Sequence, residues 1–327
     1  MKAILVCENN SLRWSDVPDP VIKEDEVLVE IHAAALNRAD LMQREGDYPP
    51  PSGCPEWMGL EISGVIIQMG TVAEAKSTFH IGDSVCALLG GGGYAEYAAV
   101  KYDMLMPIPK NCSEIEAAAM PEAFATAYLN LFLEADIQPG NTLLMNAGAS
   151  GLASVVIPMA KAFGIRVITT VLSAEIARSI EPLNADLVID TSAKKVEDVL
   201  KEELRQGRPV DVAIDCLGGP ALGKCLPYLS YQGRWIVIAA LAGRESSVPL
   251  KTIYEKNIRI IGSTLRSRTP EMKAMILAGL VRNVWPKVEE GLIRPTIYKV
   301  LPITQAEEAH DILYRGENVG KVVLKVR

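Results

Sequence analysis

The stretch NTLLMNAGASGLASVVIPMAKAF, residues 141–163, decides the fold of this chain. It passes from a short apolar segment through a loop of small residues into apolar residues at helical spacing, which predicts a strand, a turn and a helix. This order is typical of the first unit of a dinucleotide-binding βαβ fold, because small residues let a pyrophosphate approach the free amides of a helix N-terminus. Ala153 takes the third small position of the glycine pattern, and Pro158 is expected to kink the helix. An ordinary βα turn is the alternative interpretation of the motif alone.

Strands and helices alternate on the C-terminal side of this stretch, which predicts an α/β fold with a doubly wound parallel sheet. The predicted strands are 141–146, 166–170, 187–189, 210–215, 234–239 and 258–261. The predicted helices are 151–163, 173–182, 194–206 and 220–230.

Residues 1–110 have a different pattern, with period-two alternation at 27–31 and further strand-like runs at 60–69 and 84–89. They favour a partly open β-barrel. Ser113 and Glu116 form a capping box that predicts a helix, and a second helix is expected over 122–133. After a helix over 270–283, a strand near 297–300 and a helix over 304–314, a last strand at 321–326 is expected to rejoin the N-terminal part. The predicted domains are therefore 1–122 with 265–327, and an inserted cofactor domain, 123–264, with the active cleft between them.

Composition excludes several classes of function. The chain has 327 residues, 49% of them apolar, and a net charge of −7, which argues against a nucleic-acid or membrane-surface role carried by bulk charge. Its six cysteines are scattered without a C-x-x-C pair, a pattern that suits a reducing cytosol. No stretch approaches the roughly 18 apolar residues of a membrane span. We therefore expect a cytoplasmic protein.

Six spaced blocks of sequence resemble the quinone oxidoreductase branch of the zinc-independent medium-chain dehydrogenase/reductase superfamily, and within it the tumour-suppressor-inducible group. The blocks are 35–44 (ALNRADLMQR), 59–64 (GLEISG), 120–127 (MPEAFATA), 215–219 (DCLGG), 263–268 (STLRSR) and 318–321 (NVGK). The resemblance implies a GroES-like barrel domain, a Rossmann domain, and hydride transfer from NADPH to a quinone or an α,β-unsaturated carbonyl. It also implies a homodimer.

The residues themselves argue against a catalytic zinc. Zinc-dependent relatives use a Cys and a Gly-His-Glu, whereas the matching stretches here are Leu36-Asn37-Arg38 and Gly59-Leu60-Glu61. None of the three histidines stands near a cysteine at ligand spacing. No metal is expected.

The resemblance also implies roles for particular residues. Asn37 and Tyr48 are expected on the nicotinamide and substrate side, and Thr126 is expected near the nicotinamide; a loop aromatic and a capped helix position are the alternatives for the last two. We expect most of the cofactor to be bound at the carboxyl ends of the sheet strands, although ordinary turn chemistry is the alternative there. The predicted cofactor-binding residues are Gly148, Ala149, Ser150, Gly151, Leu152, Thr170, Ser173, Arg178, Thr191, Leu217, Gly218, Ala239, Ala240, Leu241, Thr264, Leu265, Arg266, Asn318 and Lys321.

The 2′-phosphate corner departs from the family pattern. Residues 170–173 (TVLS) contain no acid to bind a free ribose hydroxyl, which favours NADPH. However, Ile176 and Thr191 replace the Lys and Tyr with which the family binds the phosphate, so Ser173 and Arg178 remain to meet it, and NADH is the alternative cofactor.

Two further functions stay open on the sequence. A reductase of enoyl thioesters would need a basic entrance, and no dense Lys/Arg cluster is present. A dinucleotide-binding sensor or structural protein with little turnover is the third alternative, and Ile176, Thr191 and Pro158 favour it.

Overall fold

A computed structural model describes all residues, 1–327. The chain forms two compact units. The first unit comprises residues 1–125, 268–291 and 295–327, and the second comprises residues 126–267 and 292–294.

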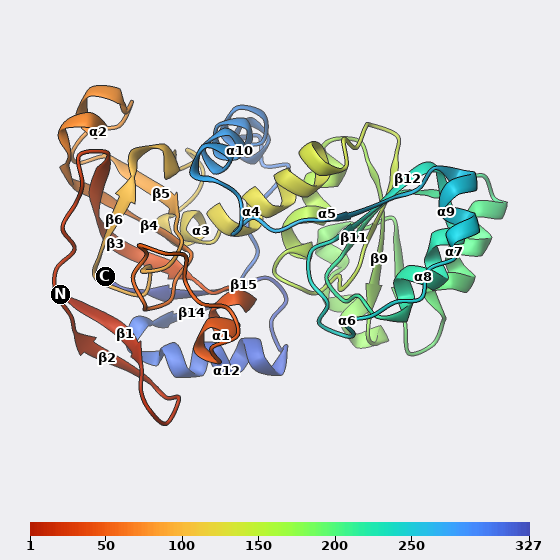
Figure 1. The fold of residues 1–327 in the computed structure, drawn as a ribbon, viewed down its shortest axis with the longest axis horizontal. Coiled ribbons are helices and arrows are strands. Elements are labelled where there is room, and N and C mark those ends of the chain that lie inside the picture. Colours follow the sequence, from red (N-terminus) through yellow and green to blue (C-terminus); the bar gives the residue numbers. More distant parts are fainter. The chain divides into compact units, whose positions relative to one another are not determined.

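The second unit contains a six-stranded, all-parallel sheet (Figure 1). Along the sheet the strands are β10 (Leu187–Asp190), β9 (Arg166–Val171), β8 (Thr142–Met145), β11 (Val210–Asp215), β12 (Leu229–Val237) and β13 (Arg259–Gly262). Renumbered from β8, this order is 3-2-1-4-5-6, the doubly wound dinucleotide-binding topology, which confirms the predicted fold. The order reverses between β8 and β11, so the loops that follow these two strands border the crevice where ligands bind in such sheets.

Helices cover both faces of this sheet, with α5 on one face and α7, α8 and α9 on the other (Figure 1). They are α5 (Ala153–Ala162), α6 (Ala174–Ser179), α7 (Val196–Arg205), α8 (Pro220–Cys225) and α9 (Leu250–Lys256). The side chains of Leu144, Ile168 and Trp235 are buried beneath them. The apolar runs of the parallel strands thus form the core.

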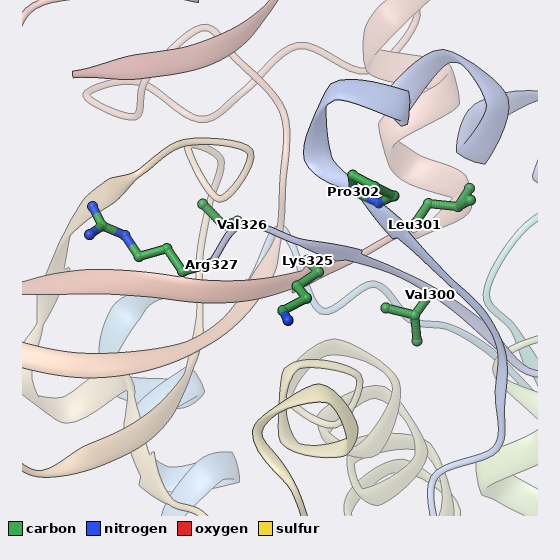
Figure 2. A pocket seen from close by; sticks show the side chains of 6 residues that line it. All are labelled: Val300, Leu301, Pro302, Lys325, Val326 and Arg327. Carbon is green, nitrogen blue, oxygen red and sulfur yellow. The ribbon is translucent and has the colours of Figure 1, made fainter.

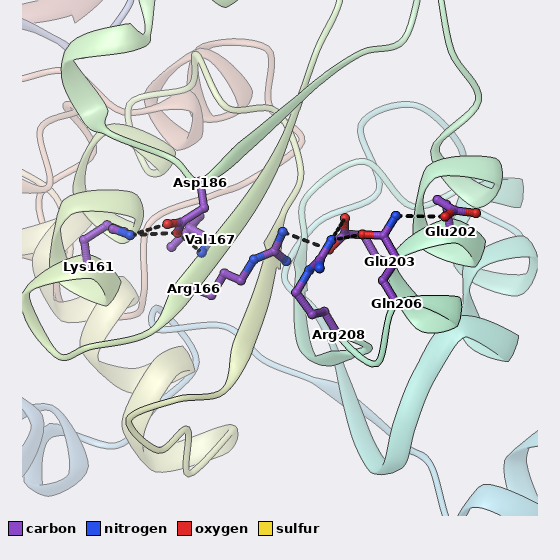
Figure 3. Close-up of polar contacts among 8 residues, drawn as sticks. All are labelled: Lys161, Arg166, Val167, Asp186, Glu202, Glu203, Gln206 and Arg208. Atoms are coloured by element: carbon purple, nitrogen blue, oxygen red, sulfur yellow. Dashed lines mark hydrogen bonds and ion pairs between the residues drawn. The ribbon is translucent and has the colours of Figure 1, made fainter.

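An ion pair ties α7 to strand β9, and a backbone hydrogen bond ties the loop before β10 to the same strand (Figure 3). Glu203 on α7, which is 7% exposed, lies between Arg166 of β9 at 2.8 Å and Arg208 at 2.9 Å. Asp186 accepts hydrogen bonds from Lys161 and from the backbone amide of Val167, each at 2.7 Å. These contacts hold the amino-terminal end of β9 in place.

The first unit contains a seven-stranded mixed sheet and a separate hairpin. The sheet order is β14 (Ile297–Pro302), β15 (Lys321–Lys325), β3 (Glu26–Ala35), β4 (Glu61–Met69), β5 (Ser84–Leu88) and β7 (Leu105–Pro107), with β6 (Tyr97–Lys101) paired to β3. The hairpin pairs β1 (Lys2–Val6) with β2 (Leu12–Asp16). Its helices are α1 (Arg38–Arg44), α2 (Thr71–Lys76), α3 (Glu114–Ala118), α10 (Pro270–Asn283), α11 (Trp285–Glu289) and α12 (Ala306–Arg315), and α4 (Pro121–Tyr128) begins in this unit and ends in the other. As predicted, the last strand, β15, rejoins the N-terminal sheet, antiparallel to β3.

Two predicted helices are too long, and four short helices were not predicted. The helix predicted over 220–230 ends at Cys225, because Pro227 follows in a single 3₁₀ turn and β12 begins at Leu229. The helix predicted over 173–182 ends at Ser179, just before Pro182. The unpredicted helices are α1, α2, α9 and α11. No helix in the structure is both long and apolar enough to cross a membrane.

Candidate active and cofactor site

The loop after β8 is held tightly against β9. The Gly148 amide donates to the Thr170 carbonyl at 2.7 Å, and the Ala147 amide donates to the Thr170 hydroxyl at 3.0 Å. A Cβ at position 148 would lie 2.4 Å from the Thr169 hydroxyl oxygen, so only glycine fits this close approach. Thr170, predicted to bind the cofactor, thus fixes the loop that the cofactor would contact.

Three amides of this loop remain unpaired where a phosphate would bind. The Ser150 amide donates to the Ala147 carbonyl at 2.9 Å and is therefore occupied within the turn. Three other amides, which precede the first residue of α5, donate no hydrogen bond to any group of the protein. These amides belong to Ala149, Gly151 and Leu152. Backbone N–H groups at the beginning of a ten-residue helix fit a pyrophosphate.

Asp215, at the end of β11, organises the opposite side of the switch point. Its carboxylate is fully buried and accepts four hydrogen bonds of 2.9–3.1 Å, from Asn146 Nδ2, Trp235 Nε1 and the amides of Leu217 and Gly218. The turn that carries Leu217 and Gly218 is therefore fixed beside the phosphate loop. The sequence motif contained Asp215, but no site role was predicted for it.

The loops that follow β11, β12 and β13 carry the remaining predicted residues of this unit. The Leu241 amide donates to the Cys216 carbonyl at 3.1 Å, and the Ala242 amide to the Leu217 carbonyl at 2.8 Å, so the first two loops are joined. After β13, Thr264 is hydrogen-bonded to Ser267 through the two hydroxyls. The same loops carry Gly218, Ala239, Ala240, Leu265 and Arg266. All of these lie at the carboxyl edge of the parallel sheet, as predicted for a dinucleotide site.

The 2′-phosphate corner offers few donors. The Thr191 hydroxyl donates to the Val171 carbonyl at 2.9 Å, so its proton is already used. Ser173 caps α6 by accepting from the Ile176 amide at 3.3 Å, and its own hydroxyl hydrogen remains available. Arg178, on α6, is exposed. A phosphate here would be met by Ser173 and Arg178, without a Lys.

In the first unit, Lys321 lies in a buried ionic network. It is 3% exposed, and Nζ lies 2.6 Å from each of three acceptors, the Glu61 carboxylate, Asn37 Oδ1 and the Leu36 carbonyl. Three acceptors use all three ammonium protons. Any effect of Lys321 on a bound ligand therefore passes through Asn37 and Glu61, and its predicted contact with the cofactor stays a prediction.

Asn37 is oriented by this network. Its Oδ1 accepts from Lys321, while its Nδ2 donates to Glu61 Oε1 at 2.9 Å, which fixes the amide orientation. Its backbone amide donates to Asp40 Oδ2 at 2.7 Å. One Nδ2 hydrogen of Asn37 remains available for an acceptor such as a carbonyl oxygen.

Two further carboxyls belong to the same cluster. Asp40 is fully buried and also accepts from the Gly59 amide at 3.1 Å; burial raises the pKa of Asp40 to about 6. Glu122 is half-buried in the first turn of α4, and its backbone amide donates to Glu61 Oε2 at 2.9 Å. Burial, together with the nearby charge of Glu61, raises the pKa of Glu122 to about 7.

Sequence reasoning missed Glu61, Asp40 and Glu122 as site residues. Each stands inside a block that carried the family resemblance, but their convergence depends on β4, α1 and α4 packing together, which no local pattern shows. A signal was present, because acidic residues flanked by apolar ones at buried positions require partners.

The other predicted residues lie outside this network. Tyr48 is partly exposed in the loop after α1, and Asn318 Nδ2 donates to the Gly320 carbonyl at 2.6 Å. Thr126 lies on α4, in the second unit, where its carbonyl accepts from Asn130 Nδ2 at 2.7 Å. Their contacts with a ligand stay predictions.

A shallow cavity of about 340 Å³ on the first unit holds none of the predicted residues (Figure 2). It is lined by Val300, Leu301, Pro302, Lys325, Val326 and Arg327, from β14, β15 and the residues after β15. The structure also places no three His, Cys, Asp or Glu side chains where they could hold one metal ion.

Comparisons with known proteins agree with this geometry. A model of the alcohol dehydrogenase GroES-like domain matches residues 23–110, and a model described as zinc-binding dehydrogenase matches residues 151–278. Mouse quinone oxidoreductase is 30% identical over 313 residues, 95% of this chain and 92% of the mouse protein. Bovine quinone oxidoreductase-like protein 2 is 29% identical over 95% of this chain and 87% of its own length.

Solved structures show the same fold. The quinone oxidoreductase of Thermus thermophilus, solved alone and in complex with NADPH, is 28% identical and superposes with a TM-score of 0.83 over all of both chains. An NAD-dependent alcohol dehydrogenase is 29% identical, with a TM-score of 0.84 over all of both chains. The two structures therefore differ in the cofactor named for them, although both resemble this chain equally well.

Proposed function

Because the chain belongs to the quinone oxidoreductase family of the medium-chain dehydrogenase/reductase superfamily, we propose that it is an NADPH-dependent oxidoreductase that transfers hydride to a quinone or an α,β-unsaturated carbonyl. The cofactor supplies the hydride, and the protein supplies binding and orientation. We assign cofactor binding to a domain over 123–264, and catalysis to a GroES-like domain over 1–122 and 265–327. The expected compartment is the cytoplasm, which six free cysteines support.

The observation that carries the proposal is the phosphate loop. Three unpaired amides, of Ala149, Gly151 and Leu152, stand at the switch point of a doubly wound sheet, which is the arrangement that a dinucleotide pyrophosphate requires. Residues 170–173 contain no acid, which favours NADPH over NADH. We propose that no metal takes part.

Asn37 supports an oxygen-bearing acceptor. The network of Lys321 and Glu61 leaves it one oriented N–H, which can donate to a quinone or enone oxygen and stabilise the negative charge that hydride transfer places there. We propose that Tyr48 lies on the substrate side and that Thr126 lies near the nicotinamide.

A paired titration tests both the cofactor and the activity. The purified protein is titrated with NADPH and with NADH by cofactor fluorescence, and a simple quinone or enone is then added. We expect tighter binding of NADPH and oxidation that depends on the acceptor. A preference for NADH would mean that Ile176 and Thr191 have changed the cofactor, whereas tight binding without oxidation by any acceptor would favour a dinucleotide sensor. An enoyl thioester is the further acceptor to compare.

We also propose that the protein is a homodimer. Strand β13 is an edge of the parallel sheet, and its Ile260 side chain is 42% exposed. An exposed apolar edge strand can pair with a second copy of itself.

A further inference from the structure

A half-buried acid, Glu122, stands in the ionic cluster that orients Asn37. We propose that the Glu122 carboxyl is the proton donor of the reduction, delivering to the acceptor oxygen the proton that accompanies the hydride. This inference rests on the proposed function, because it concerns the acceptor of that same reaction.

The cluster contains more acids than buried cations. Glu61, Asp40 and Glu122 contribute three carboxyls, whereas Lys321 is the one ammonium group bonded within it. Glu61 and Asp40 are fully buried. Ionising all three acids would leave two uncompensated negative charges in a poorly solvated site, which is costly, so a proton is retained on one of them.

Hydrogen bonds decide which acid retains the proton. Glu61 accepts from Lys321 Nζ, Asn37 Nδ2 and the Glu122 amide, and Asp40 accepts from two backbone amides, so both carboxyls are bound by donors. The side chain of Glu122 accepts no hydrogen bond in the structure. It is therefore the acid that donors stabilise least when ionised, and partial exposure leaves it open to a small molecule.

Charges from four elements set the acidity of Glu122. Glu61 of β4 and Asp40 of α1 favour the protonated form, whereas Lys321 of β15 and Lys273 of α10 favour the ionised form. Burial dominates, and the pKa of Glu122 is raised to about 7. A carboxylic acid with a pKa near the working pH can both release and regain a proton during turnover.

Glu122 and Asn37 bind opposite oxygens of one carboxylate. The Glu122 amide donates to Glu61 Oε2, and the Asn37 side chain donates to Glu61 Oε1. The residue proposed to hold the acceptor oxygen and the residue proposed to protonate it are thus positioned by the same anchor.

The step balances in atoms and electrons. Hydride from the nicotinamide brings two electrons and one hydrogen to the acceptor, and the cofactor is oxidised. The O–H bond of Glu122 breaks as a new O–H bond forms on the acceptor, which leaves a hydroquinone, or an enol when the acceptor is an enone. The Glu122 carboxylate then takes a proton from water.

The test compares Glu122→Gln with Glu122→Asp and with a control, Glu74→Gln, an exposed acid on α2. For the unmodified protein, kcat/KM should fall as the pH rises through about 7, because Glu122 loses its proton. Glu122→Gln should lower kcat about 100-fold and abolish this pH limb, whereas NADPH binding should stay within about twofold. Glu122→Asp should retain the limb, and Glu74→Gln should change nothing.

A second measurement does not depend on turnover. Infrared difference spectroscopy should show a protonated carboxyl band that titrates near pH 7 and is absent from Glu122→Gln, whereas a separate band of Asp40, which titrates near pH 6, should remain. If the protein reduces quinones or enones while Glu122→Gln keeps both kcat and the pH limb, or if the band persists in that variant, the inference is overturned. If no acceptor is reduced but the band is present, the proposed function fails while Glu122 still holds the proton.

Discussion

At the scale of single residues, the Lys321–Glu61 ion pair is the most deeply buried electrostatic contact of the first unit. The two side chains are 4% and 0% exposed. Lys321→Met should lower the free energy of unfolding by about 3–5 kcal/mol, because it leaves the Glu61 carboxylate buried without its cation. Urea unfolding measures this loss. In the double variant Lys321→Met, Glu61→Gln, part of the lost free energy of unfolding should be recovered. A loss in the double variant equal to the sum of the losses in the two single variants would show that the two residues are not coupled.

A second residue-scale prediction concerns His310. Its imidazole, on α12, is 1% exposed, neither ring nitrogen has a hydrogen-bond partner, and burial lowers its pKa to about 3. The folded protein therefore holds it neutral, while the unfolded chain binds a proton below about pH 6.5. Acidification favours the unfolded chain, so this stability is complete above about pH 6.5 and is lost as the pH falls toward about 3.

The measurement is the free energy of unfolding of the unmodified protein and of His310→Leu between about pH 7.5 and pH 5. Their difference should change by up to about 1.4 kcal/mol per pH unit below about pH 6.5, with the variant losing less stability. The comparison separates the contribution of His310 to stability from those of Asp40 and Glu122. The raised pKa values of these two acids change the stability with pH in the opposite direction. His80, whose side chain is 82% exposed, supplies the control His80→Gln. Parallel curves for the protein and His310→Leu would refute the assignment.

At the scale of elements, Glu203 attaches α7 to β9 (Figure 3). Glu203→Gln should destabilise the second unit by about 1.5–3 kcal/mol, because two charge-assisted contacts weaken together. The control is Glu202→Gln, an exposed neighbour on the same helix. Contact with Arg208 lowers the pKa of Glu203, so its contribution is present at neutral pH and is lost on acidification through that lowered pKa. Thermal unfolding at neutral pH measures the difference, and equal melting temperatures for the two variants would contradict it.

Elements with local signals were predicted well from the sequence. Helix α10 has the predicted bounds, because Thr269 caps it and Pro270 occupies its first position. The predicted capping box of Ser113 and Glu116 is confirmed at α3. Helix α9 was missed because it has only seven residues and no side-chain N-cap that would mark its start. Short α1 depends on the long-range anchoring of Asp40, which no sequence window contains.

At the scale of the whole molecule, the two halves of the site differed in how far they could be predicted. The cofactor loops follow from strand–turn–helix order, since every parallel strand ends at the same edge, and the prediction of loop residues 148–152 needed no distant contact. The acidic cluster joins β4, α1, α4 and β15, which are far apart in the chain. Residue types alone could not show that the ammonium group of Lys321 would bond to Glu61 and Asn37.

The last prediction concerns assembly. If β13 pairs with a second copy, light scattering should give a dimer, and Ile260→Lys should shift the protein toward monomer, because a charge on an exposed edge strand opposes strand pairing. Ile81, an equally apolar residue that is 64% exposed in a loop of the first unit, provides the matched control Ile81→Lys. The control should remain dimeric. A dimer that survives Ile260→Lys would exclude β13 as the interface, and a monomer at all concentrations would exclude the dimer itself.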